Sequence, residues 1–136
     1  MNRLVDSTRA AAYVALVPAI TKVAREFGYA TCVHGSLSTD LDIVLVPWVE
    51  DAGEPDDVVE AIRLLIGGKK AKHDVLPQKK PLGRLAWSYF LTEEGANSFG
   101  GGSYPYVDIS VTPRGHHPKP GPTALNEPTK DQSCTG

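Results

Sequence analysis

Apolar residues recur near helical spacing between Ser7 and Gly28, which predicts a long N-terminal helix. The series consists of Ala11, Val14, Ala15, Val17, Ile20, Val23, Ala24 and Phe27. Asp6 or Ser7 can cap the start of this helix, and Gly28 suits its end. Because proline lacks an N–H and its ring clashes with the preceding turn, we expect Pro18 to kink the helix or divide it in two.

A second helix is predicted to begin at Pro55 and to end near Gly67 and Gly68. Proline is favoured at the first helical position, and Asp56 and Asp57 place negative charge at the positive end of the helix dipole. Lysines follow the end of the helix, where positive charge is favourable. The expected buried stripe consists of Val58, Val59, Ile62, Leu65 and Ile66.

Four segments have the patterns of β-strands. They are 29–33, 41–46, 84–91 and 104–111. The run 41–46 is almost continuously apolar, so we expect both of its faces to be buried. The third strand alternates, with Leu85, Trp87, Tyr89 and Leu91 on one face. The basic connection 69–81 can contain a short strand, and the glycine-rich segment 92–103 is predicted to be a mobile hairpin loop.

These elements predict an α+β fold, in which a mixed β-sheet of about four to five strands is flanked by two main helices. This domain would occupy residues 1–112. Core packing is the expected role of Trp48 and Trp87. From Pro113 onward the chain has five prolines in 24 residues and scarcely any large apolar side chain. We therefore predict a flexible, proline-rich tail over residues 113–136.

The nearly even charge balance gives no global signature of nucleic-acid binding. The 136 residues include 14 Lys and Arg and 16 Asp and Glu, for a net charge of −2. This length suits one domain with a modest core, so a partner protein or a homo-oligomer could supply what a larger enzyme carries in a second domain.

The two cysteines, Cys32 and Cys134, have neither disulfide nor metal-ligand spacing, which favours a reducing compartment. The N-terminus lacks the pattern of a signal peptide, and no stretch approaches the roughly 20 apolar residues of a membrane span. We expect a cytoplasmic protein with no membrane partner.

Candidate chemistry is concentrated after a Gly35-Ser36 turn, where Asp40 and Asp42 occupy alternate positions at the entrance to a predicted strand. Alternate residues of a strand project to the same face, so the two carboxylates would lie side by side. A hard divalent cation such as Mg²⁺ binds carboxylate oxygens and would offset their repulsion. The alternative is a solvated strand entrance with both carboxylates in water.

A third acid, Asp108, stands alone within the apolar strand 106–111. An unpaired charge is costly to bury in such a strand. If this strand lies beside 41–46, Asp108 would join Asp40 and Asp42 in a cluster that can bind one or two Mg²⁺ ions. Alternatively, Asp108 faces water or pairs with Arg84 or a lysine.

The sequence of a Gly-Ser turn, an Asp-x-Asp pair entering a strand and a third acid on a later strand resembles the DNA polymerase beta-type nucleotidyltransferase superfamily. The resemblance spans roughly Tyr13 to Arg114 and is to the small single-domain members, including minimal and phage-encoded ones. It implies transfer of a nucleoside monophosphate from a nucleoside triphosphate, such as ATP, to an acceptor that the sequence does not identify. The acceptor could be a protein, a small molecule or a nucleic-acid end.

The resemblance also implies a role for each matching residue. Gly35 and Ser36 would contact the phosphates, and the catalytic residues Asp40, Asp42 and Asp108 would be the ligands of a two-metal Mg²⁺ site. Among the basic residues, Lys72 and Arg84 could neutralise the triphosphate.

One feature departs from the family pattern. Only Leu37, Ser38 and Thr39 separate the Gly-Ser turn from the Asp-x-Asp pair, whereas this segment is usually longer in the family. The short turn leaves open a catalytically inactive nucleotide-binding module, or an antitoxin-like module that binds a partner protein. A metal-dependent nuclease is a third hypothesis, because acidic clusters also cleave phosphodiesters.

Overall fold

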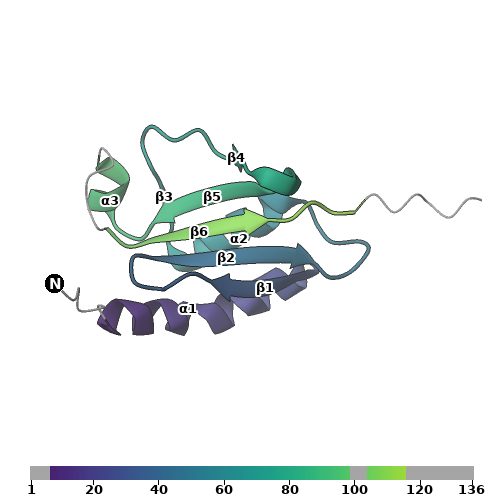
Figure 1. The fold of residues 1–136 in the computed structure, drawn as a ribbon, viewed down its shortest axis with the longest axis horizontal. Coiled ribbons are helices and arrows are strands. Elements are labelled where there is room, and N and C mark those ends of the chain that lie inside the picture. The colour runs from purple at the N-terminus through teal and green to yellow at the C-terminus, as the bar shows by residue number, and fades with distance from the viewer. Residues whose placement is uncertain (1–6, 99–103, 116–136) are drawn as a thin grey trace, which may run out of the picture.

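The computed structural model describes residues 7–98 and 104–115, which form a mixed sheet covered on one face by two long helices (Figure 1). In chain order the elements are α1 (Ser7–Glu26), β1 (Tyr29–His34), β2 (Asp40–Pro47), α2 (Pro55–Ile66), β3 (Lys69–Lys70), β4 (Gln78–Lys79), the 3₁₀ turn η1 (Pro81–Gly83), β5 (Leu85–Phe90), α3 (Glu93–Asn97) and β6 (Tyr106–Val111). The predicted α+β class is therefore confirmed, with short β3 and β4 completing the sheet. None of the described helices is long and apolar enough to span a bilayer.

The strand order is β1-β2-β6-β5-β3, and β4 also pairs with β5. The β2–β6 pair is parallel, whereas the other pairs are antiparallel. The expectation that 106–111 lies beside 41–46 is confirmed. The register places Asp42 directly opposite Asp108 across this pair.

The two faces of β2 differ in burial, so the expectation that both are buried is wrong. Leu41, Ile43 and Leu45 are fully buried in the core that α1 and α2 cover. Asp40, Asp42 and the other alternate residues lie on the opposite face and are only partly buried, because neither long helix packs there. We call this side of the sheet the open face.

Helix α1 runs without interruption from Ser7 to Glu26, so of the two outcomes expected at Pro18 the division does not occur, and the kink stays a prediction. Pro18 is exposed on the outer side of the helix, where water can bond the backbone carbonyl that lacks a helical partner. Tyr13 and Ile20 are buried on either side of it. Packing of both halves against the core therefore outweighs the local cost of the proline.

Helix α2 spans Pro55–Ile66, in agreement with the predicted start at Pro55 and end near Gly67, and Gly67 caps it in a left-handed conformation with φ 65°. Three residues of the expected stripe, Val58, Val59 and Ile62, are buried. Leu65 is 46% exposed, so its assignment to the stripe is wrong. The helix buries a narrower face than its apolar sequence indicates.

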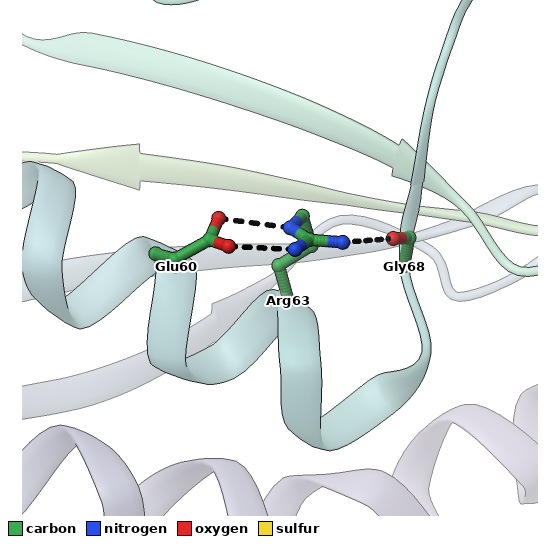
Figure 2. A network of polar contacts seen from close by, with 3 residues as sticks. All are labelled: Glu60, Arg63 and Gly68. Carbon is green, nitrogen blue, oxygen red and sulfur yellow. Dashed lines mark hydrogen bonds and ion pairs between the residues drawn. The ribbon is translucent and has the colours of Figure 1, made fainter.

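The C-terminal end of α2 is tied to the next segment by Arg63 (Figure 2). Its guanidinium donates two hydrogen bonds to the Glu60 carboxylate, at 2.8 and 2.6 Å, and a third to the Gly68 carbonyl oxygen at 3.1 Å. The Gly68 N–H in turn donates to the Arg63 carbonyl at 2.8 Å. This last bond satisfies the Arg63 carbonyl, one of the backbone groups that a helix end leaves without a helical partner.

The segment between β5 and β6 contains α3, so the prediction of a loop throughout 92–103 is wrong. Thr92 caps this short helix by accepting a hydrogen bond from the Gly95 N–H at 3.1 Å. Residues 99–103 lie outside the described part. Core packing is confirmed for Trp87, which is 4% exposed, and is wrong for Trp48, which is 77% exposed.

Of the predicted tail, only residues 113–115 are described. Arg114 donates to the Ala52 carbonyl oxygen at 3.1 Å and to the Glu54 carboxylate at 2.6 Å, which ties this segment to the loop before α2. Residues 116–136 lie outside the described part of the chain, so the flexible tail stays a prediction.

Candidate metal centre

Three carboxylates converge on the open face, near the ends of β2 and β6 at which these parallel strands begin. Asp40 and Asp42 come from β2, and Asp108 comes from β6. Each offers a carboxylate oxygen, and the three oxygens lie within 4.8 Å of one another. We call these residues the acidic triad. Its three oxygens are close enough to bind one metal ion together.

The electrostatic cost of this arrangement is greatest at Asp42, whose pKa is raised from 3.8 to about 6. Burial is the largest cause, followed by the negative charge of Asp40 and a hydrogen bond with it. His34, opposite Asp42 on β1, lowers this pKa, and Asp108 raises it further. A bound cation would remove the repulsion within the triad.

Gly35 brings the turn after β1 directly against the triad. It has a φ of 76°, which favours glycine, and a Cβ at this position would lie 2.3 Å from Oδ2 of Asp42. Any side chain would therefore displace the carboxylate or the turn. The structure thus joins the predicted phosphate-contacting turn to the predicted metal ligands.

The hydroxyl of Ser36 is engaged within this turn. Its Oγ lies 2.6 Å from Oγ of Ser38, and the Ser38 N–H donates to it at 3.3 Å. Both hydroxyls are accessible, since Ser36 is exposed and Ser38 is half-buried. A phosphate oxygen could therefore replace the hydrogen bond between the two hydroxyls. The phosphate-binding role of Ser36 stays a prediction.

Ser88 is a polar partner of the triad that sequence reasoning missed. It lies on β5 opposite Asp108, and its hydroxyl donates to Oδ1 of Asp108 at 2.8 Å. This bond fixes one carboxylate oxygen and leaves the other available. The sequence signal is weak: Ser88 is the polar residue of an alternating strand, and only the β5–β6 register pairs it with Asp108.

Two tyrosines make hydrogen bonds at the start of β2. The Tyr106 hydroxyl hydrogen-bonds Asp40, and burial, followed by the charge of Asp40, raises its pKa to about 12. The Tyr13 hydroxyl, from α1, donates to the Thr39 carbonyl oxygen at 2.7 Å. Since Tyr106 remains protonated at neutral pH, it is a lasting hydrogen-bond donor to Asp40.

The two predicted phosphate-binding cations, Arg84 and Lys72, lie at different distances from the triad. Arg84 donates to the Pro81 carbonyl oxygen at 3.3 Å and to Oγ of Ser110 at 3.5 Å. Its guanidinium therefore lies beside Ser110, two positions after Asp108 on the same face of β6, or about 7 Å from Asp108 along the strand. Lys72 is exposed and follows β3, at the far edge of the sheet from β1. Their roles toward a triphosphate stay predictions.

No protein-family model, curated protein or solved structure matches this chain.

Proposed function

We propose that this protein is a Mg²⁺-dependent nucleotidyltransferase, which transfers a nucleoside monophosphate from a nucleoside triphosphate to an acceptor hydroxyl. The observation that carries the proposal is the convergence of Asp40, Asp42 and Asp108 on the open face, with the Gly35 turn against Asp42. A long acceptor or a nucleotide base could approach this face, because neither α1 nor α2 covers it.

The donor set favours magnesium over the softer transition metals. All three ligands are carboxylates, and hard cations prefer oxygen donors. Three carboxylates leave positions for water and phosphate oxygens in an octahedral shell. When bound, magnesium would neutralise the triphosphate and the charge of the departing pyrophosphate.

The chain's own residues would orient the reactants. The backbone N–H groups of the Gly35-Ser36 turn would bind phosphate oxygens beside the triad. Asp108, oriented by the hydrogen bond from Ser88 to its Oδ1, would bind the metal beside the acceptor hydroxyl and would help to remove the proton of that hydroxyl. The acceptor oxygen then forms a bond to the α-phosphorus as the bond from that phosphorus to pyrophosphate breaks.

The direct test is transfer of radiolabel from the α-phosphate of each of the four common ribonucleoside triphosphates. The acceptor source would be a cell extract freed of endogenous nucleotides, incubated with the protein and Mg²⁺. We expect labelled product from the wild type and loss of at least about 100-fold in Asp42→Asn and Asp108→Asn. Asp51→Asn, an exposed acid outside the triad, is the matched control and should retain activity. Equal label transfer by wild type and Asp108→Asn would refute the assignment.

A nucleotide-binding module without turnover is the second candidate. The observation that favours it is the short turn after Ser36, whose hydroxyl already bonds Ser38. Calorimetry with Mg²⁺ and a triphosphate, followed by analysis of the nucleotide after long incubation, separates the two candidates. Binding with unchanged nucleotide favours the module, whereas release of pyrophosphate favours the transferase. Metal-dependent loss of labelled DNA or RNA without a triphosphate would instead indicate a nuclease.

A further inference from the structure

The two edges of the sheet are built differently. At one edge lie β3 and β4, each two residues long, and three of their four residues are lysines. Short, lysine-rich edge strands discourage pairing with another chain. The opposite edge is the six-residue β1, which contains no Lys, Arg, Asp, Glu or Pro. The β1 edge therefore lacks the features that normally prevent pairing.

The backbone of β1 has groups available on its outer side. The Trp48 N–H donates to the Gly28 carbonyl, so Gly28 and Trp48 are a hydrogen-bonded residue pair. Hydrogen-bonded and non-hydrogen-bonded pairs alternate along an antiparallel ladder. Ala30 and Cys32 therefore direct their backbone groups toward β2. Thr31 and Val33 then direct theirs away from the sheet. Within the described chain, no strand lies on that side of β1.

The helix below this edge is also unusually apolar on its outside. Helix α1 has no charged residue from Ala10 to Thr21, although several of these residues are exposed. Val14, which is 53% exposed, and Pro18 lie on the same helical stripe as Thr21 and Arg25, which line a cavity together with residues of β1. An uncharged, exposed stretch of helix next to the unpaired edge of β1 favours an apolar partner over a charged one.

The edge carries a projection at one end and a hollow at the other. The projection is Val33, which is 42% exposed. The hollow is a cavity of about 580 Å³, lined by Thr21, Arg25, Tyr29, Thr31, Trp48 and Val49. Trp48, which is 77% exposed, forms part of its wall.

We propose that β1 pairs with β1 of a second copy of this chain, antiparallel and centred on Thr31. The two-fold axis would place Thr31 opposite its symmetry mate and Val33 opposite the other copy's Tyr29. Val33 of each copy would then enter the cavity of the other, so one surface supplies both halves of the interface. Such pairing uses the outward N–H and C=O groups of Thr31 and Val33 as ladder hydrogen bonds.

The side chain of Thr31 supports this centre of symmetry. Its Oγ1 is buried and has no hydrogen-bond partner among the described residues. That oxygen is covered by this chain's own atoms, so the Thr31 side chain would have to rotate about χ1 to expose it at the outer edge of β1. Directly opposed threonines on neighbouring strands can then hydrogen-bond each other, and the second copy would supply the missing partner. Since equivalent side chains face the same side, the two sheets would join with both helix layers on one face and both acidic triads on the other. This inference does not depend on the proposed function.

The mass of the full-length protein in solution, from sedimentation equilibrium, gives the first test. We expect a species of twice the 14.6 kDa chain mass, with a dissociation constant of about 10 μM or lower. Val33→Lys should weaken the dimer by roughly 100-fold or more, because a lysine would be buried without a partner. Val75→Lys, at an 86% exposed valine far from β1, is the matched control and should leave the dimer intact. A monomer at all concentrations up to about 1 mM would overturn the proposal.

Disulfide trapping tests the register. In a Cys32→Ala, Cys134→Ala background, Thr31→Cys should form a disulfide-linked dimer under mild oxidation, because paired Cα atoms lie about 5.5 Å apart. Val33→Cys should not form a disulfide-linked dimer, because residue 33 of one copy would be about 14 Å from residue 33 of the other. Hydrogen exchange on the wild type provides a readout without substitution, since the Thr31 and Val33 amides should become protected as protein concentration rises. A dimer in which those amides exchange as fast as in the monomer would overturn the proposed pairing.

Discussion

Replacement of Asp42 by asparagine should stabilise the metal-free protein at neutral pH. The folded chain holds the pKa of Asp42 at about 6 instead of 3.8, mainly through burial and the neighbouring charge of Asp40. At about 1.4 kcal/mol per unit of pKa, keeping Asp42 ionised costs roughly 3 kcal/mol, and partial solvent access reduces this to about 2 kcal/mol. Asparagine has nearly the same shape and no charge, so Asp42→Asn removes that cost.

The sign of the pH dependence follows from the same pKa. The unfolded chain releases the Asp42 proton near pH 3.8, whereas the folded chain holds it until about pH 6. The contribution of Asp42 to the free energy of unfolding is therefore fully present below pH 3.8 and is lost as pH rises to about 6. Asp42→Asn should be about 2 kcal/mol more stable than wild type at pH 8 and nearly equal to it at pH 4.

Urea unfolding in EDTA at several pH values measures this difference, with Asp51→Asn as the exposed control. At pH 8, Mg²⁺ should make the wild type more stable than Asp42→Asn, because a ligand at 100 times its dissociation constant stabilises the folded wild type by about 2.7 kcal/mol. Asp42→Asn lacks one of the three ligands, so Mg²⁺ should increase its stability much less. The reasoning is refuted if Asp42→Asn lowers stability at pH 8 in EDTA, or if Mg²⁺ stabilises variant and wild type equally.

Further substitutions test the Gly35 turn, the Ser88 hydrogen bond and the difference between the two faces of the sheet. Gly35→Ala should weaken Mn²⁺ binding at least about 10-fold and lower the free energy of unfolding by about 1–3 kcal/mol. Gly67 has a similar φ but open space around it, so Gly67→Ala should lower stability and leave Mn²⁺ binding unchanged. Calorimetry would measure the binding, and urea unfolding the stability. Ser88→Ala should weaken Mn²⁺ binding about 10-fold, and Ser88→Thr should restore it. Ile43→Ala, in the core, should lower the free energy of unfolding by about 3 kcal/mol, as measured by thermal unfolding. Val44→Ala, on the open face, should lower it by under about 1 kcal/mol. Equal losses of stability would contradict the difference in burial between the two faces of the sheet.

The sequence alone could predict the acidic triad because each of its parts depends on a short-range pattern. The alternation of a strand puts Asp40 and Asp42 on one face, and an isolated acid in an apolar strand marks Asp108. One long-range assumption was needed, that these strands are neighbours, and the parallel β2–β6 pair confirms it. Ser88 could not be found in this way, because its role depends on the register of a third strand.

Local propensity misled where tertiary packing decided the outcome. Pro18 does not divide α1, since core residues on both sides hold the helix, and Thr92 starts a short helix in a glycine-rich segment by capping it. The exposure of Trp48 depends on where the chain leaves β2, which composition does not determine. Burial on one face of the sheet likewise depends on the helices covering a single side.

The most direct test of the metal centre is Mn²⁺ titration followed by electron paramagnetic resonance, which counts free Mn²⁺ and needs neither substrate nor acceptor. The structure predicts binding by the wild type and by Asp51→Asn with equal affinity. It predicts affinity at least about 10-fold weaker for Asp42→Asn and for Asp108→Asn, because each removes a ligand that converges on the same point. Equal Mn²⁺ affinity in the wild type and both triad variants would contradict a metal site at Asp40, Asp42 and Asp108.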